Sequence, residues 1–266
     1  PKETLEILEK AKEKSIINKY HPKNIILTGA TGFLGVHILE EFLNNEQGKI
    51  FCIVRKEPGL SITRKITQKL TYYFGEKYND LINKRIIPIE GDICKPQFGL
   101  KQDEILKISN DIDLVINCAA NASHFGKYDD FYSSNVKSVM YIVEFCKKFN
   151  KRLYHISTTG IAGKMLEQNY EEKEFSESSL YIGQYLDSVY SYTKFEAETV
   201  VLNAIANHVD AYILRLGNLM PRLRDGVFQE NIQENAFVNK FADFMKLSII
   251  PDYLLENRIE FTPIDL

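Results

Sequence analysis

The sequence predicts an α/β protein built on a doubly wound parallel sheet with helices on both faces. Short apolar runs of the buried-strand type alternate along the chain with segments whose apolar residues recur at helical spacing. The runs are continuously apolar, which is typical of parallel strands covered on both faces. Right-handed crossovers between such strands give a doubly wound fold, in which the carboxyl ends of the parallel strands share one edge, where a ligand is expected.

Six segments have the length and apolar content of buried strands: residues 24–28, 50–54, 85–90, 113–117, 153–157 and 211–216. Four segments between them have helical periodicity: residues 36–43, 62–74, 134–149 and 188–206. The segment 62–74 is the clearest, because Ile62, Ile66, Leu70 and Phe74 follow at steps of four. A further helix is predicted over residues 228–244, with Phe237, Phe241 and Phe244 on one face.

The composition is that of an ordinary globular protein. The 266 residues include 44% hydrophobic residues, 33 Lys and Arg and 36 Asp and Glu, which give a net charge of −3. This balance offers no electrostatic basis for binding nucleic acid or an anionic membrane. No run approaches the apolar length of a membrane span. The four cysteines lack metal-ligand spacing, so no metal site is predicted, and a reducing cytoplasmic setting fits best.

A glycine-rich turn follows the first predicted strand and opens the first helix. It reads Gly29-Ala30-Thr31-Gly32-Phe33-Leu34-Gly35. Such a tight turn needs residues without a Cβ, and Gly32 would let the backbone approach a pyrophosphate. The free N–H groups of the helix start favour that anion. Between a strand and a helix, the triplet predicts a dinucleotide site.

The end of the second strand indicates which dinucleotide. An acidic residue about 20 positions after the glycines would bind the ribose hydroxyls, but Arg55 stands there. A guanidinium pairs with a 2′-phosphate, which favours NADPH over NADH. Arg64 either closes on the same phosphate or is a solvated helix charge. Asp92, followed by Ile93 at the end of the third strand, either binds the adenine amino group or caps a turn.

A second constellation, Tyr190-Ser-Tyr-Thr-Lys194, places a phenol and an ammonium on one helical face. The positive charge is expected to lower the pKa of Tyr190, so that the phenol acts as a general acid. Tyr192 has no Lys or Arg four residues later. Thr158 follows the fifth strand and could donate to a carbonyl oxygen as charge develops, although Ser157 or Thr159 could supply that hydroxyl instead.

Several motifs together are similar to the extended short-chain dehydrogenase/reductases, and within them to the thioester reductase group. These are the terminal reductase domains of non-ribosomal peptide synthetases and carboxylic acid reductases. The resemblance rests on the motifs 28–35, 91–93, 117–120, 135–136, 157–158 and 190–194. Group-specific features are the Arg55 strand end, the stretch 90–100, the run 215–219 and the segment 261–265.

The resemblance implies a Rossmann-like fold with Thr158, Tyr190 and Lys194 as the catalytic residues. It implies NADPH-dependent release of a carrier-bound acyl or peptidyl thioester as an aldehyde, with further reduction to an alcohol in some members. The partner would be a phosphopantetheinyl carrier protein upstream in the same polypeptide. Beyond the glycine turn and the residues already named, the expected cofactor contacts are Ala119, Ala120, Asn135, Leu216, Gly217 and Asn218.

The same resemblance divides the chain into three parts. Residues 1–22 would be a linker from an upstream module, 23–220 the NADP-binding domain, and 221–266 the start of a mostly helical substrate region that is truncated. One alternative is a fatty acyl-CoA reductase or a sugar-nucleotide epimerase or dehydratase, and Arg55 disfavours the epimerase. The other is an inactive NADP-binding module, which would not require Thr158, Tyr190 and Lys194 together.

Overall fold

The computed structural model describes residues 6–7, 9–10, 20–123, 126–165, 174–252 and 260–266. Most of the predicted linker over residues 1–22 lies outside the described residues. The chain divides into two compact units, Pro1–Leu216 and Gly217–Leu266. We describe each unit by itself.

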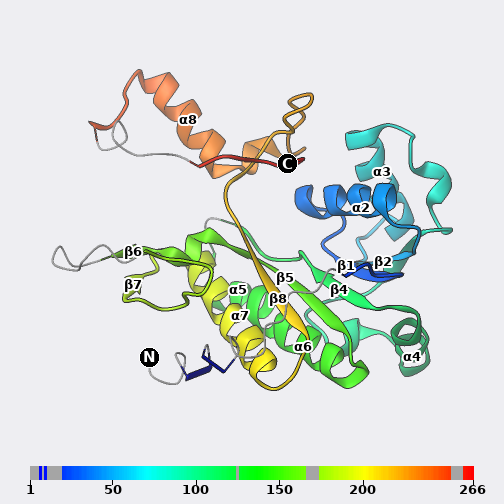
Figure 1. Ribbon diagram of the computed structural model, residues 1–266. Helices are drawn as coiled ribbons and strands as arrows, with labels where there is room; N and C mark the ends of the chain where they lie inside the picture. The colour runs from blue at the N-terminus through cyan, green and yellow to red at the C-terminus, as the bar shows by residue number, and fades with distance from the viewer. Residues whose placement is uncertain (1–5, 8, 11–19, 124–125, 166–173, 253–259) are drawn as a thin grey trace. The chain divides into compact units, whose positions relative to one another are not determined.

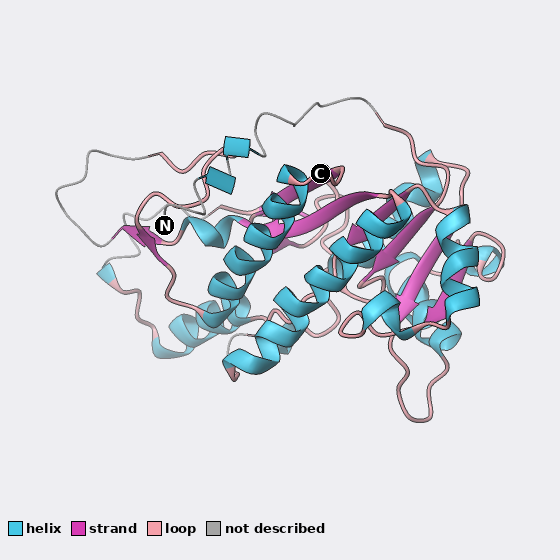
Figure 2. Cartoon of the chain, turned by 90° about the horizontal axis from the view of Figure 1, so that it is seen from below, coloured by secondary structure: helices cyan, strands magenta, loops and turns pink. Residues whose placement is uncertain are grey.

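The first unit is built on a six-stranded sheet with the strand order β3-β2-β1-β4-β5-β8 (Figures 1 and 2). Every strand pairs with its neighbours in parallel, which confirms the predicted doubly wound sheet. The strands are β1 (Ile25–Thr28), β2 (Ile50–Val54), β3 (Ile86–Glu90), β4 (Leu114–Asn117), β5 (Arg152–Thr158) and β8 (Ala211–Leu216).

Helices cover both faces of this sheet (Figure 1). On one face lie α2 (Phe33–Asn45) and α3 (Ile62–Phe74), and on the other lie α6 (Ser138–Phe149) and α7 (Val189–Ala206). Val115 and Leu153 of the strands pack with Phe145 of α6 and Val201 of α7 in one buried apolar cluster. This core fixes the carboxyl edge of the sheet, because the helices that follow β1, β4 and β5 all start there.

Two helices differ from the sequence prediction. Helix α4 (Gln102–Asp111) was not predicted, because it buries only Ile105, Ile108 and Ser109 and its other positions are polar. The helix predicted from residue 228 begins later, as α8 (Ala236–Leu247), so that prediction was wrong over residues 228–235. The Asn235 side chain accepts a hydrogen bond from the Val238 N–H at 3.0 Å and so starts α8 as its N-cap.

The segment predicted as one helix over residues 134–149 consists of several pieces. A turn of α-helix, α5 (Tyr128–Phe131), leads into η3 (Tyr132–Lys137), which has π-helical hydrogen bonding, and then into α6. Single π-helical turns occur frequently at functional sites, since they redirect a side chain. Here the π-helical turn carries Asn135.

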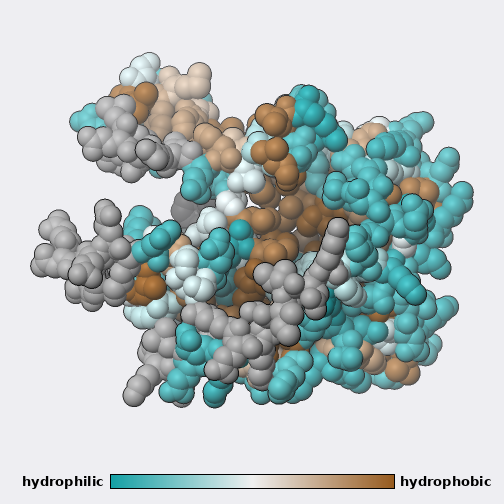
Figure 3. Space-filling view, viewed as in Figure 1, coloured by the Kyte–Doolittle hydropathy of each residue, from teal (hydrophilic) through white to brown (hydrophobic). Residues whose placement is uncertain are grey.

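The remaining elements of the first unit are short. They are η1 (Asn79–Leu81), η2 (Pro96–Gly99), η4 (Thr159–Ala162) and the antiparallel pair β6 (Lys164–Met165) and β7 (Gln184–Tyr185). Figure 3 shows that most of the surface over α3 is hydrophilic. None of the helices within the described ranges is long and apolar enough to cross a membrane.

The second unit contains a short parallel pair and one long helix. The pair joins β9 (Leu219–Met220) and β10 (Thr262–Pro263), and η5 (Ile232–Glu234) precedes α8. Along α8, the ring centroids of Phe237 and Phe241 lie 4.7 Å apart, and those of Phe241 and Phe244 lie 6.2 Å apart. The predicted aromatic face of this helix is therefore present.

Candidate active site

The glycine turn joins β1 to α2 and leaves a helix start without side-chain caps. Gly32 is the N-cap of α2, no side chain bonds there, and the first turn carries no acidic residue. A Cβ on Gly35 would lie 2.1 Å from the Gly29 carbonyl oxygen, so only glycine fits. Gly32 is exposed, and its added Cβ would meet only that oxygen, at 3.3 Å. The cradle therefore fits a pyrophosphate, which would face Gly32 and the N–H groups of the first turn.

One predicted contact in this turn, Phe33, has its side chain engaged within the protein. The Phe33 ring stacks on His37 at 5.0 Å and on Tyr73 at 5.9 Å. Leu34 and Thr31 are half-buried. Phe33 would therefore offer its backbone N–H, and not its ring, to a phosphate.

The loop after β4 supports the glycine turn from behind. A Cβ on Gly29 would lie 2.8 Å from the Ala119 nitrogen. The Ala119 N–H donates to the Thr28 hydroxyl at 3.2 Å. Ala120, next in the chain, is exposed. Ala119 and Ala120, the two predicted alanines, therefore lie beside the turn. A residue larger than glycine at position 29 would push Ala119 away from the turn.

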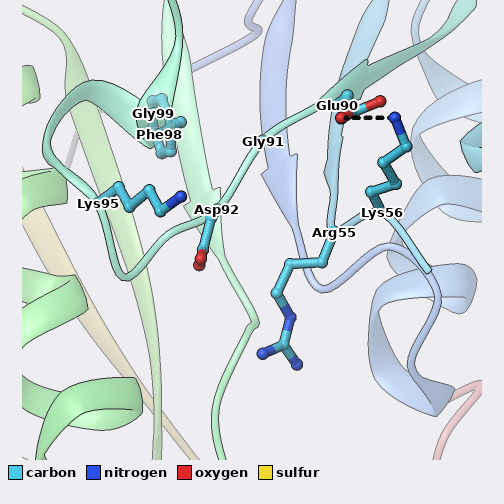
Figure 4. Close-up of a pocket in the computed structure, with 8 residues that line it drawn as sticks. All are labelled: Arg55, Lys56, Glu90, Gly91, Asp92, Lys95, Phe98 and Gly99. Atoms are coloured by element: carbon cyan, nitrogen blue, oxygen red, sulfur yellow. Dashed lines mark ion pairs between the residues drawn. The ribbon is translucent and has the colours of Figure 1, made fainter. Parts of the chain in front are cut away.

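A cavity of about 280 Å³ opens at the ends of β2 and β3 (Figure 4). It is lined by Arg55, Lys56, Glu90, Gly91, Asp92, Lys95, Phe98 and Gly99. The Lys56 ammonium pairs with the Glu90 carboxylate at 3.5 Å, whereas Arg55 extends away from that pair. Arg55 thus lines this cavity, and its contact with a 2′-phosphate remains a prediction.

The other residues predicted around the adenosine have different surroundings. Arg64 is exposed in the first turn of α3 and is not among the residues that line this cavity. Asp92 lines the cavity, and its carboxylate also accepts from the Cys94 N–H at 2.9 Å, so it does close a turn. The Ile93 side chain packs against the apolar core, which leaves its backbone for a ligand.

Helix α7 places Tyr190 and Lys194 one turn apart. The Ser188 hydroxyl accepts from the Ser191 N–H at 3.0 Å and starts this helix as its N-cap. The Lys194 ammonium is buried and donates to the Ile156 carbonyl of β5 at 2.6 Å. Burial lowers the pKa of Lys194 to about 8, while the charges of Glu198 and Cys118 oppose that change.

The predicted lowering of the Tyr190 pKa is wrong in this structure. Tyr190 is half-buried, and burial raises its pKa above the ordinary value. The reason is that the Lys194 ammonium is directed to the Ile156 carbonyl and does not contribute to the Tyr190 shift. Tyr192 is exposed and stacks with Tyr128 at 6.1 Å, away from this arrangement.

The end of β5 supplies the candidate hydroxyls. The half-buried Thr158 hydroxyl accepts from the Gly160 N–H at 3.0 Å. A Cβ on Gly160 would lie 3.2 Å from both that hydroxyl and the Ser191 hydroxyl, so the end of β5 adjoins the first turn of α7. The Ser157 hydroxyl is buried and has no partner among the described residues. Thr159 is exposed. Thr158 therefore remains the best placed of the three.

Asn135 joins three parts of the site. Its carbonyl oxygen accepts from the Asn121 N–H at 2.7 Å, and its amide donates to the Asn121 carbonyl at 3.0 Å and to the Thr193 hydroxyl at 3.1 Å. Contact of Asn135 with the cofactor remains a prediction. Both protons of its side-chain amide already have partners within the protein. The side chain ties the loop after β4 to α7, beside Lys194.

The sequence prediction missed a buried polar row across the centre of the sheet. The Thr28 hydroxyl donates to the side-chain Oδ1 of Asn117 at 2.6 Å, and the side-chain Nδ2 of Asn117 donates to His155 Nδ1 at 3.2 Å. Burial and the Lys194 charge hold the pKa of His155 well below its ordinary value, so the ring is neutral. This row could have been found in the sequence, because Thr28, Asn117 and His155 are polar residues within apolar strand segments.

The last predicted contacts span the division between the two units. Leu216 ends β8 in the first unit. In the second unit, a Cβ on Gly217 would lie 3.3 Å from the Thr262 hydroxyl, and the Asn218 carbonyl accepts from the Thr262 N–H at 2.9 Å. Contacts of these three residues with a cofactor remain predictions.

Comparison with known proteins identifies the family of the chain. The model of a family described as "Male sterility protein", an NAD-binding family, matches residues 27–266. A solved thiolation-reductase di-domain from an archaeal non-ribosomal peptide synthetase is 36% identical, with a TM-score of 0.85. The match covers 98% of this chain and 70% of that one.

Two curated proteins are also similar. Probable polyketide synthase 44 of Dictyostelium discoideum is 30% identical over 210 residues, which is 76% of this chain and 7% of that protein. Glycine betaine reductase ATRR of Emericella nidulans is 25% identical over 252 residues, which is 91% of this chain and 19% of that protein. The chain thus spans a small part of these curated relatives. It belongs to the NAD-binding "Male sterility protein" family, and its predicted kinship with the thioester reductase domains of peptide synthetases is confirmed.

Proposed function

We propose that this chain catalyses the NADPH-dependent release of a carrier-bound acyl or peptidyl thioester as an aldehyde. The observation that carries the proposal is the arrangement on α7. Tyr190 lies one turn before a buried Lys194, and both adjoin the end of β5 that bears Thr158. The archaeal thiolation-reductase di-domain supports the assignment, because its name pairs a reductase with a carrier domain.

The choice of NADPH over NADH rests on Arg55. Its guanidinium reaches a cavity at the strand end, whereas the neighbouring Lys56 is paired with Glu90. An acidic residue at the position of Arg55 would suit the ribose hydroxyls of NADH, and a guanidinium suits a phosphate. Asp92, in the same cavity, would meet the adenine.

When bound, the dinucleotide supplies a hydride to the thioester carbonyl carbon. The Thr158 hydroxyl donates a hydrogen bond to the carbonyl oxygen as negative charge develops there. Tyr190 transfers its phenolic proton to that oxygen, which gives a hemithioacetal. Its raised pKa keeps the phenol protonated before the reaction. Collapse of the hemithioacetal breaks the C–S bond and yields the aldehyde and the carrier thiol.

Lys194 acts on the cofactor in this scheme. Its ammonium, fixed on the Ile156 carbonyl, would hold the nicotinamide ribose hydroxyls through its remaining protons. Asn135 would act on Lys194 indirectly, through Thr193.

The test is turnover of a pantetheine or carrier-bound acyl thioester with NADPH, with mass spectrometry of the products. We expect aldehyde and free thiol from the wild type, and a loss of at least 100-fold in Tyr190→Phe. Tyr192→Phe is the matched control and should keep wild-type turnover, because Tyr192 lies on the exposed side of α7. Equal turnover by both variants would refute the assignment of Tyr190.

A further inference from the structure

The face of α7 that carries Tyr190 and Lys194 continues to a third chemical group. Glu198 follows Lys194 by four residues, so the three side chains lie along one face of the helix. Glu198 is 0% exposed, although it carries a charge. A carboxylate so deeply buried is costly unless a cation and hydrogen bonds compensate it.

The compensating cation is Arg215 of β8. Its guanidinium forms a two-pronged ion pair with Glu198, with a shortest N–O distance of 2.7 Å and a second hydrogen bond from Nε at 3.0 Å. Paired bonds of this kind fix the orientation of both groups. Glu198 is therefore held rigidly on the face of α7 that also carries Tyr190 and Lys194.

The same guanidinium also holds the segment that precedes α7. It donates to the Ser176 carbonyl at 3.1 Å and to the Ser179 carbonyl at 2.7 Å, and it lies 5.0 Å from the Phe175 ring centroid. Leu180, next in the chain, is buried against Ile161 and Leu202. One side chain thus connects residues 175–179 to the buried charge on α7.

The charges that act on Lys194 come from three elements. The charge of Glu198, which lies on the same helix as Lys194, favours the protonated form of Lys194. A thiolate at Cys118, in the loop after β4, would favour that form too. The Cys118 thiol is itself protonated, because burial raises its pKa to about 12. His155 of β5 is neutral, and Tyr190 is a neutral phenol. Among these groups, Glu198 is therefore the one whose charge, seen in its ion pair with Arg215, favours the ammonium of the buried Lys194.

We propose that Glu198 and Arg215 form a positioning pair, in which Glu198 keeps Lys194 protonated and Arg215 fixes Glu198 and anchors residues 175–179. Neither residue contacts the reacting atoms. The pair thereby couples the protonation of Lys194 to the segment leading into α7. This inference rests on the proposed function for the importance of Lys194, but its physical content does not need turnover to be tested.

The experiment is an NMR titration of protein labelled with ¹³Cε-lysine, in which a Lys194→Arg variant assigns the Lys194 signal. We expect Glu198→Gln to move the titration midpoint of Lys194 down by about one pH unit. Glu196→Gln removes the same charge two residues earlier, where the carboxylate bonds the exposed Tyr128 hydroxyl, and should leave the midpoint unchanged. Equal midpoints in Glu198→Gln and wild type would overturn the proposal.

Two further variants keep the test decisive. If the unpaired Arg215 unfolds Glu198→Gln, the double variant Glu198→Gln/Arg215→Gln removes both buried charges and should still lower the midpoint, but by less, because loss of the Arg215 cation offsets part of the shift. Arg215→Lys keeps the charge but loses the planar fork. It should leave the Lys194 midpoint in place and speed amide hydrogen exchange at residues 176–180 at least tenfold. Unchanged exchange there would contradict the anchoring role.

NADPH titration of Lys194→Met separates the two proposals. A lowered Lys194 titration midpoint in Glu198→Gln, together with normal NADPH binding by Lys194→Met, would support the positioning pair and refute the role of Lys194 in cofactor binding. An unchanged midpoint in Glu198→Gln, together with weakened NADPH binding by Lys194→Met, would retain the proposed function and refute the positioning pair.

Discussion

The glycines at positions 32 and 35 are expected to fail in different ways when each is replaced by alanine. A Cβ on Gly35 would lie 2.1 Å from the Gly29 carbonyl oxygen, more than 1 Å closer than the 3.4 Å of an ordinary contact. The backbone of β1 or α2 must therefore move. Overpacking of this kind costs about 1–3 kcal/mol, which exceeds the roughly 0.5–1 kcal/mol that alanine gains over glycine inside a helix.

The Gly32→Ala change is expected to act on the ligand instead. Gly32 is exposed, has an ordinary φ of −85°, and its new Cβ would meet only the Gly29 oxygen, at 3.3 Å. Its free energy of unfolding should fall by no more than about 1 kcal/mol, because glycine is a better N-cap than alanine. The methyl group would, however, occupy the space that the pyrophosphate needs.

Urea unfolding and NADPH calorimetry distinguish these effects. We expect Gly35→Ala to lower the unfolding midpoint, and Gly32→Ala to lower it less but to lose at least tenfold in NADPH affinity. Full NADPH affinity in Gly32→Ala would refute the idea that a pyrophosphate lies against this turn. A Gly35→Ala protein as stable as the wild type would refute the packing argument.

Three other predictions concern the rest of the site. Arg55→Ala should lower NADPH affinity at least tenfold and leave NADH affinity unchanged, as calorimetry with both nucleotides will show. Lys56→Ala, which removes a cation already paired with Glu90, should change both affinities little. NADPH affinity should fall as the pH rises through about 8, because the buried Lys194 ammonium loses its proton there, and this fall should be absent in Lys194→Met. Asn135→Leu should lower the free energy of unfolding by about 1–3 kcal/mol in urea titrations, because the Asn121 backbone loses its partners.

The strands could be predicted from the sequence because most of them are continuously apolar, and the clearest helices because their apolar residues recur at helical spacing. Helix α3 has the predicted limits, since its apolar residues follow at steps of four and Ser61 caps it. Helix α4 escaped prediction, because it packs on the core through few apolar side chains. The start of α8 was misplaced, because the Asn235 cap was overlooked in favour of apolar content.

Motifs local in the sequence could be found, but groups that meet across the sheet could not. The glycine turn and the Tyr190–Lys194 spacing each lie within a few residues. By contrast, Glu198 and Arg215 come from different elements, and only the packing of α7 on β8 joins them. The Tyr190 pKa was predicted in the wrong direction for a related reason. Spacing places an ammonium nearby, but neither its hydrogen-bond partner nor the degree of burial can be derived from spacing.

The most direct test of reductive release follows the hydride itself. The chain is incubated with an acyl thioester on a phosphopantetheinyl carrier and with NADPH that carries deuterium at the transferred position. The account predicts an aldehyde with one deuterium on its carbonyl carbon, together with free carrier thiol and oxidised cofactor. Release of the acid without deuterium, or an aldehyde without deuterium, would contradict hydride transfer to the thioester.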